Sequence, residues 1–157
     1  MEELSTGVTR DIYPMPAFVT LAVADVERTV DFYVGALDFV ELFRMPGPDG
    51  GGPALVHLRR WRYQDILVRP GEADPGSGWA VSVAAVADEL PRLVERARAH
   101  GHGEVSDPTD TPWNTRDVNV TDPDGYRLVY TARRPEGERD EAFGQRIVAL
   151  AREQLGA

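Results

Sequence analysis

The chain alternates short apolar stretches with amphipathic ones, in an order that repeats. Residues 17–23 are rich in β-branched and aromatic side chains, a composition that predicts a strand. A helix is predicted next, because apolar residues recur at the spacing of one helix face, at Val26, Val30, Tyr33 and Leu37. Glycine and proline concentrate over 44–53 and predict a loop, after which 54–59 and 64–69 are predicted strands.

The same order restarts further along the chain. Val-Ser-Val-Ala-Ala-Val-Ala-Asp over 81–88 echoes Val-Thr-Leu-Ala-Val-Ala-Asp over 19–25, with one inserted residue. A second helix is predicted from the apolar positions Leu90, Leu93, Val94 and Ala97. Strands over 116–121 and 127–132 follow, around a turn at 122–125. A period of about 60 residues therefore indicates a duplicated unit.

These patterns divide the chain into five segments. They are a lead-in over 1–16, a first module over 17–70, a linker over 71–78, a second module over 79–133 and an amphipathic helical segment over 134–157. The last segment carries apolar residues on one helix face, at Phe143, Ile147, Leu150, Ala151 and Leu155. We expect it to be an appendage that packs on the modules or stabilises a dimer.

Charge and cysteine content narrow the classes of partner. The chain has 26 acidic residues against 17 Lys and Arg, a formal charge of −9, and the segment 133–157 is neutral. Such a surface repels nucleic acid and anionic membranes, and it favours a cationic ligand or serves solubility. The absence of cysteine excludes disulfides and thiolate metal sites. With no apolar run near the ~18 residues of a membrane span, we expect a cytoplasmic protein.

Two motifs resemble one superfamily. Phe18-Val-Thr-Leu-Ala-Val-Ala-Asp, followed by Asp31-Phe-Tyr, resembles the opening of a vicinal oxygen chelate module, and Asp122-Pro-Asp-Gly-Tyr-Arg-Leu-Val-Tyr resembles its closing turn and last strand. That superfamily includes glyoxalase I, bleomycin resistance proteins and extradiol dioxygenases. The resemblance, over about residues 15–133, implies an α+β fold of two βαβββ modules. It also implies a shared curled-sheet cavity, helices outside the sheets, and a homodimer.

The resemblance also implies where a metal would bind. Catalytic members hold a divalent metal with four side chains, usually His, Glu or Gln. The motif register places the first ligand position at Phe18 and the last at Val129. The other two positions fall at Gly78, Trp79 or Val81, and near Ile66 to Val68. Only Asp65 offers a carboxylate nearby, so we expect no metal and no cofactor.

Without metal ligands the cavity floor is expected to be apolar. Strand alternation places Thr20 on the face of Phe18, with Val129 on the corresponding face of the last strand. Trp61, at a predicted hairpin tip, and Trp113 are candidate rim walls for a planar ligand, with packing as the alternative for both. The expected ligand-binding set is Phe18, Thr20, Trp61, Asp65, Trp113, Arg116 and Val129.

Arg116, Tyr126 and the run over 59–63 are polar or aromatic positions near the predicted cavity. Arg116 either pairs with a ligand carboxylate or phenolate or forms a salt bridge to Asp117 or Asp110, the latter being favoured. Tyr126, which replaces the Asn of the family turn, is expected at the surface. The run of cationic and aromatic residues over 59–63 is expected to be an exposed hairpin or a dimer contact.

Three functions fit these patterns. The first is a metal-independent protein that sequesters an aromatic or cationic metabolite or drug. The second is a metal-free isomerase or cyclase with Asp65, His57 or Arg116 as acid or base. The third is a structural or regulatory dimer with a filled cavity. An open apolar cavity favours the first, and an open cavity with a buried, pKa-shifted Asp or His favours the second.

Overall fold

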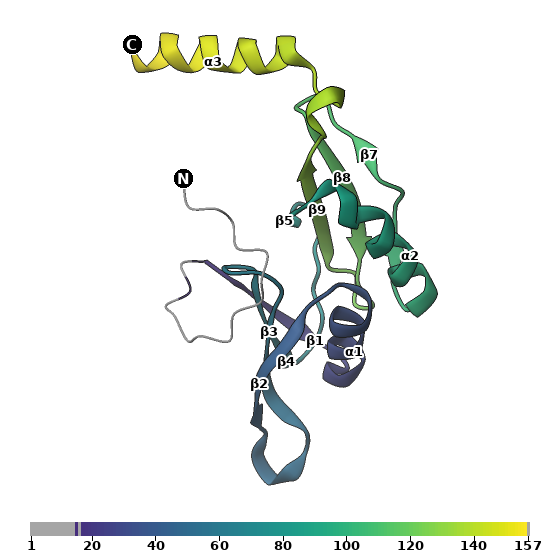
Figure 1. The fold of residues 1–157 in the computed structure, drawn as a ribbon. Coiled ribbons are helices and arrows are strands. Elements are labelled where there is room, and N and C mark those ends of the chain that lie inside the picture. Colours follow the sequence, from purple (N-terminus) through teal and green to yellow (C-terminus); the bar gives the residue numbers. More distant parts are fainter. Residues whose placement is uncertain (1–14, 16, 157) are drawn as a thin grey trace.

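The computed structural model describes Met15 and residues 17–156, so most of the expected lead-in lies outside the described residues. Two βαβββ units follow one another (Figure 1). The first contains β1 (Val19–Val23), α1 (Val26–Ala36), β2 (Val40–Pro46), β3 (Pro53–Arg59) and β4 (Asp65–Pro70). The second contains β5 (Val81–Ala85), α2 (Leu90–His100), the short β6 (Glu104–Val105) and β7 (Thr109–Asp110), β8 (Thr115–Thr121) and β9 (Arg127–Arg133). The predicted α+β class is confirmed.

Each unit builds one mixed sheet. The first sheet has the order β1-β4-β3-β2, and β1 runs parallel to β4 while the other pairs are antiparallel. The second sheet has the order β5-β9-β8-β6, with β7 also paired to β8, and β5 runs parallel to β9. The loop expected to begin at residue 44 begins later, because β2 pairs with β3 as far as Pro46.

The helices cover one face of each sheet because strand and helix residues share an apolar core. Leu21 and Val23 of β1 point to this side and are buried with Val30 and Tyr33 of α1. Helix α1 starts where the Asp25 carboxylate accepts a hydrogen bond from the Arg28 backbone N–H at 3.0 Å. In the described part of the chain, the opposite face of each sheet carries no helix, and we call it the open face (Figure 1).

Buried tyrosine hydroxyls join the second unit to the first. Tyr126 donates to the carbonyl oxygen of Ala22 at 2.8 Å, and Tyr130 donates to that of Leu37 at 2.8 Å. The expectation that Tyr126 lies at the surface is wrong, because its hydroxyl reaches under β1 and only 5% of the residue is exposed. The closing turn therefore fastens the two units together within one chain.

Arg60 makes a second link between the units. This side chain is 1% exposed and donates to the carbonyl oxygen of Ala84 at 2.7 Å, while its other terminal nitrogen bonds to Glu89. Its guanidinium stacks on Trp61 at 4.1 Å and lies 5.0 Å from the ring centre of Tyr130. A cation that would be costly to bury alone is thus compensated by the second unit.

The run over 59–63 is therefore not an exposed hairpin. Arg59, Arg60 and Trp61 are buried, and only Arg62 and Tyr63 are exposed. Trp61 is 8% exposed beneath the Arg60 guanidinium, so its expected position as a rim wall is wrong and the packing alternative holds.

Helix α3 (Glu141–Leu155) extends away from both sheets (Figure 1). Asp140 caps the first turn of α3 by accepting a hydrogen bond from the Phe143 backbone N–H. None of the described residues of α3 is buried, so the helix does not pack on the modules of its own chain. Its apolar face remains exposed, at Ile147, Val148, Leu150 and Leu155. Among the described residues, no helix combines the length and apolar character needed to cross a membrane.

Candidate functional site

The open face of the first sheet places aromatic and ionisable side chains in a regular grid. One row across the four strands contains Thr20, Leu67, His57 and Phe43. The neighbouring row contains Phe18, Asp65, Arg59 and Val40, where Phe18 continues the β1 register by one residue. Adjacent strands lie about 4.8 Å apart, so each row spans about 15 Å, which is long enough to accommodate a bicyclic aromatic ligand.

A buried polar cluster lies at the centre of this grid. Asp65 Oδ1 lies 2.7 Å from His57 Nε2 and 2.7 Å from Arg59 Nε. All three residues are buried, at 4%, 7% and 1% exposure respectively. The ring of Phe43 meets the His57 ring edge-on, at a centroid distance of 5.5 Å. We call these three ionisable residues the His57 cluster.

Exposed apolar side chains surround the His57 cluster. Phe18 and Phe43 are each 49% exposed and Met45 is 50% exposed, all on the open face. Large apolar side chains gathered on one surface are typical of binding sites. The sequence did not decide which face of β4 carries Asp65. The register of β1 and β4 places it opposite Phe18, on the open face.

A cavity of about 480 Å³ opens beside Phe18 and Asp65. It is lined from the first unit by Phe18, Phe39, Tyr63 and Ile66 among others, and from the second unit by Val81, Ser82, Val83 and Ala84. Its lining is mainly apolar, as expected. Thr20 lies on the same face of β1 but outside this lining.

The parallel strand pairs locate the four positions at which the resemblance implies metal ligands. Val19 of β1 lies beside Ile66 of β4, and Val81 of β5 lies beside Leu128 of β9. These pairs make the two units equivalent, and the corresponding open-face positions are Phe18, Leu67, Ala80 and Val129. None of these side chains carries a nitrogen or oxygen donor, so these residues do not fit a divalent metal.

This register corrects the position expected in the second unit. The equivalent of Phe18 is Ala80, and neither Gly78, Trp79 nor Val81 occupies it. Val81 lies on the helix side, beside Leu128. Across the described part of the chain, no three His, Asp or Glu side chains converge as metal ligands.

The open face of the second sheet is more polar. Val129 lies there between Ser82 and Asn119 on the neighbouring strands. One row further, Thr131 donates to the Asp117 carboxylate at 2.7 Å. Val129 is thus placed on the open face as predicted, but it lies outside the lining of the cavity.

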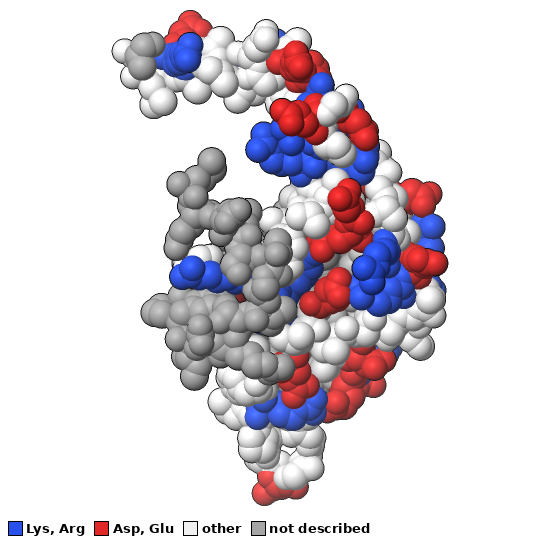
Figure 2. All heavy atoms as spheres, in the orientation of Figure 1, with Lys and Arg blue, Asp and Glu red and all other residues white. Residues whose placement is uncertain are grey.

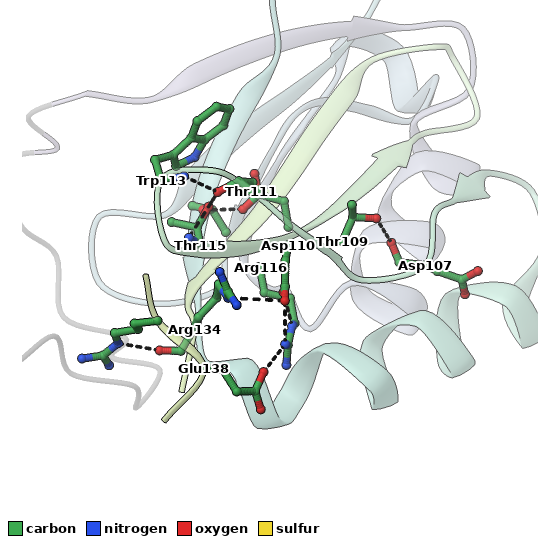
Figure 3. Close-up of polar contacts among 12 residues, drawn as sticks. Asp107, Thr109, Asp110, Thr111, Trp113, Thr115, Arg116, Arg134 and Glu138 are labelled. Carbon is green, nitrogen blue, oxygen red and sulfur yellow. Dashed lines mark hydrogen bonds and ion pairs between the residues drawn. The ribbon is translucent and has the colours of Figure 1, made fainter. Parts of the chain in front are cut away.

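Arg116 does not face the cavity. It pairs with Ala132 in the register of β8 and β9, on the helix side that also contains the buried Val118. Figure 3 shows its guanidinium between Asp110 and Glu138, with Nε 2.6 Å from an Asp110 oxygen. The hydrogen bond from Arg116 lowers the pKa of the Asp110 carboxyl. The salt-bridge alternative therefore holds, and a ligand role for Arg116 in the cavity is excluded by strand parity.

Trp113 lies on the loop between β7 and β8 (Figure 3). Its indole is 57% exposed, and its backbone N–H approaches the Thr111 hydroxyl at 3.4 Å. It does not line the cavity beside Phe18. The expected ligand-binding set is therefore divided. Phe18, Thr20 and Asp65 lie on the open face of the first sheet, whereas Trp113 lies on a loop of the second sheet.

Strand parity also places His57 in the site. His57 was interpreted as a surface or core-edge histidine, yet the β3–β4 hairpin brings it to Asp65. The available signal was the short turn, because a hairpin that pairs residue 59 with residue 65, as this one does, places 57 and 65 on the same face. Phe43 lies just before the predicted loop over 44–53, in a stretch for which the sequence predicted no strand but which forms the first half of β2.

The carboxyl group whose pKa is raised by burial, Asp122, lies outside the cavity. Burial raises the pKa of Asp122, and this outweighs the hydrogen bonds from Tyr33 and from two backbone amides. Asp122 belongs to the closing turn on the helix side. It does not line the cavity, so it is no acid for a ligand bound there.

Charges on the surface are mixed rather than segregated. On the face shown in Figure 2, acidic and basic side chains alternate, without a single-sign patch. Among the paired strand positions of β1, β3 and β4, the open face of the first sheet carries Arg59, Arg69 and one carboxylate, Asp65. The formal charge of −9 therefore does not describe this face.

Comparison with known proteins places the chain among related folds. Residues 16–130 match the family model described as Glyoxalase/Bleomycin resistance protein/Dioxygenase superfamily. The uncharacterized protein Mb0911c of Mycobacterium bovis is 30% identical over 118 residues, covering 68% of this chain and 75% of that protein.

Solved structures share the architecture at lower identity. A bleomycin resistance determinant encoded on the transposon Tn5 is 22% identical with a TM-score of 0.55, covering 74% of this chain and 96% of the other. The fosfomycin resistance protein FosX of Listeria monocytogenes, complexed with Mn(II) and sulfate ion, is 16% identical with a TM-score of 0.61, covering 77% and 93%. At these identities the likeness concerns the fold.

Proposed function

Because the chain belongs to the Glyoxalase/Bleomycin resistance protein/Dioxygenase superfamily, we propose that it binds an aromatic small molecule on the open face of the first sheet without a metal ion. The observation that carries this proposal is the side-chain content of the four equivalent ligand positions. Phe18, Leu67, Ala80 and Val129 replace donors by apolar groups. Such a floor holds a ligand by burial and stacking.

Local charge selects between the two ligand classes that the sequence suggested. The net charge of the whole chain favours a cationic ligand, but the described strand positions of the open face carry Arg59 and Arg69 against one carboxylate, Asp65. Phe18 and Phe43 offer exposed rings on the same face. An aromatic ligand therefore suits the site better than a cationic one.

The two alternatives draw less support. A metal-free enzyme on this scaffold was expected to show a pKa-shifted Asp or His in an open cavity, and the buried carboxyl with a raised pKa is Asp122, in the closing turn. A purely structural dimer was expected to have a filled cavity, whereas about 480 Å³ is open beside Phe18.

Removal of the Phe18 ring tests the binding site. For Phe18→Ala we expect at least about a fivefold loss of affinity for aromatic ligands, because stacking and burial of one ring contribute about 1–3 kcal/mol. Fluorescence titration of protein purified without chelators measures this, with metal content determined on the same sample. Trp113→Ala is the matched control and should change affinity less than about twofold. Stoichiometric bound metal, or equal losses in both variants, contradicts the proposal.

A homodimer is part of the proposal, as the resemblance implied. Four large apolar side chains of α3 are exposed in the single chain. We expect light scattering to give twice the mass of the chain, and Leu150→Asp to give the monomer because it puts a charge on that face. The exposed Arg92→Ala on α2 serves as the control that keeps the dimer mass. A monomeric wild type at micromolar concentration refutes this part.

A further inference from the structure

The His57 cluster is a polar feature that stacking alone does not require. It places a histidine, an aspartate and an arginine under the exposed rings of the open face. Burying three ionisable groups costs free energy unless they are mutually bonded, and here they are. Resting on the proposed function, we propose that His57 Nδ1 accepts a hydrogen bond from a hydroxyl group of the aromatic ligand.

The tautomer of His57 follows from its neighbours. Arg59 Nε donates a hydrogen bond to Asp65 Oδ1, so this oxygen acts as an acceptor and carries no hydrogen. The same oxygen lies 2.7 Å from His57 Nε2, and a carboxylate only accepts, so Nε2 must carry a hydrogen. In the neutral imidazole Nδ1 is then unprotonated and is an acceptor.

This acceptor has no partner of its own. His57 is 7% exposed, and within the described residues its polar contacts end with Asp65. Among the described residues, the fully buried side-chain nitrogen and oxygen atoms without a partner are Arg60 Nε and Arg134 Nε, so His57 Nδ1 keeps some contact with solvent and a ligand donor can reach it. Asp65 and Arg59 hold the ring orientation, so the donor must come to Nδ1 rather than the reverse.

The surroundings specify the donor. Exposed rings lie on two sides of His57, with Phe43 in contact and Phe18 in the neighbouring row. A protonated amine also donates a hydrogen bond, but it would enter a face that carries Arg69 and Arg59. A neutral hydroxyl on an aromatic ring meets both requirements. The ligand class is therefore a hydroxylated aromatic molecule.

Naphthol and its methyl ether form a matched pair of probes, since methylation removes only the donor. We expect the wild-type protein at about pH 8 to bind naphthol about five- to tenfold more tightly than the ether. In His57→Phe the two affinities should become equal, while circular dichroism reports whether the fold is kept. Phe18→Ala should weaken both probes equally, because it removes stacking without touching the acceptor.

The tautomer itself is measured without any variant. Long-range ¹H–¹⁵N spectra of the wild-type imidazole should show a protonated Nε2 and a bare Nδ1. Naphthol should shift the Nδ1 resonance, and the methyl ether should leave it in place. A protonated Nδ1 overturns the inference even if His57→Phe fails to fold.

The outcomes separate the two levels of the proposal. Equal binding of naphthol and ether by the wild type overturns the role of His57 and leaves aromatic binding intact. No saturable binding of either probe refutes the proposed function, and the inference with it. A preference for naphthol that persists in His57→Phe assigns the donor to another acceptor and also overturns the inference.

Discussion

Replacing Arg60 by alanine lowers the free energy of unfolding by about 3–5 kcal/mol, the largest single effect expected in this protein. The variant removes the Arg60 hydrogen bond to the Ala84 carbonyl and the ion pair between Arg60 and Glu89. It also removes the cation stacked on Trp61, in a site where the arginine is 1% exposed. The Gln64 side chain still donates to the Ala84 carbonyl and the Val86 N–H to Glu89, so the cost comes from losing the ion pair and the stacking of a buried side chain together.

Urea unfolding followed by circular dichroism measures this effect. Arg92→Ala is the control, since Arg92 is exposed on α2 and its removal should change stability by less than about 0.5 kcal/mol. A second readout concerns the module junction, because Arg60 bonds across it. Loss of a single cooperative transition in Arg60→Ala is consistent with the account, whereas a change in stability as small as that of Arg92→Ala refutes it.

Asp122→Ala is expected to cost about 2–4 kcal/mol. One oxygen of Asp122 accepts from the backbone N–H groups of Asp124 and Tyr126, each at 2.9 Å, and the other accepts from the Tyr33 hydroxyl at 2.9 Å. Alanine leaves all three donors without this partner in the closing turn. Thermal or urea unfolding measures the loss.

Asp122→Asn should retain the turn at much smaller cost. Its amide oxygen can accept from the two backbone N–H groups, and its NH₂ can donate to the Tyr33 oxygen. Burial raises the pKa of Asp122 in the folded state, so on rising pH the unfolded chain loses its proton first. Wild-type stability relative to Asp122→Asn therefore falls as pH rises above about 4 and levels off beyond the folded-state pKa. A pH-independent difference, or equal destabilisation by Ala and Asn, contradicts this assignment.

The period-two pattern of the strands was sufficient to orient the first sheet from sequence. Leu21 and Val23 form a core with the predicted helix stripe, which leaves Phe18 and Thr20 for the open face. The duplication was readable for the same reason, because apolar positions recur in the same order of elements. The same parity, applied to Val118, would have removed Arg116 from the expected ligand-binding set.

Burial of polar residues could not be predicted from composition. Arg60 and Trp61 occur in a run that resembles a solvated hairpin, and they are buried only because the second unit supplies Ala84 and Glu89 as partners. Tyr126 likewise depends on a carbonyl group from β1. These contacts join residues far apart in sequence, and no local pattern encodes them.

The account's central claim is that an aromatic ligand binds the open face of the first sheet without a metal. Titration of chelator-treated, ¹⁵N-labelled protein with naphthol tests it most directly, by mapping which backbone amide resonances move. The predicted result is a saturable shift concentrated at Thr20, His57 and Leu67, unchanged when Mn²⁺ is added. Shifts confined to the loop around Trp113, or shifts that require Mn²⁺, would contradict the claim.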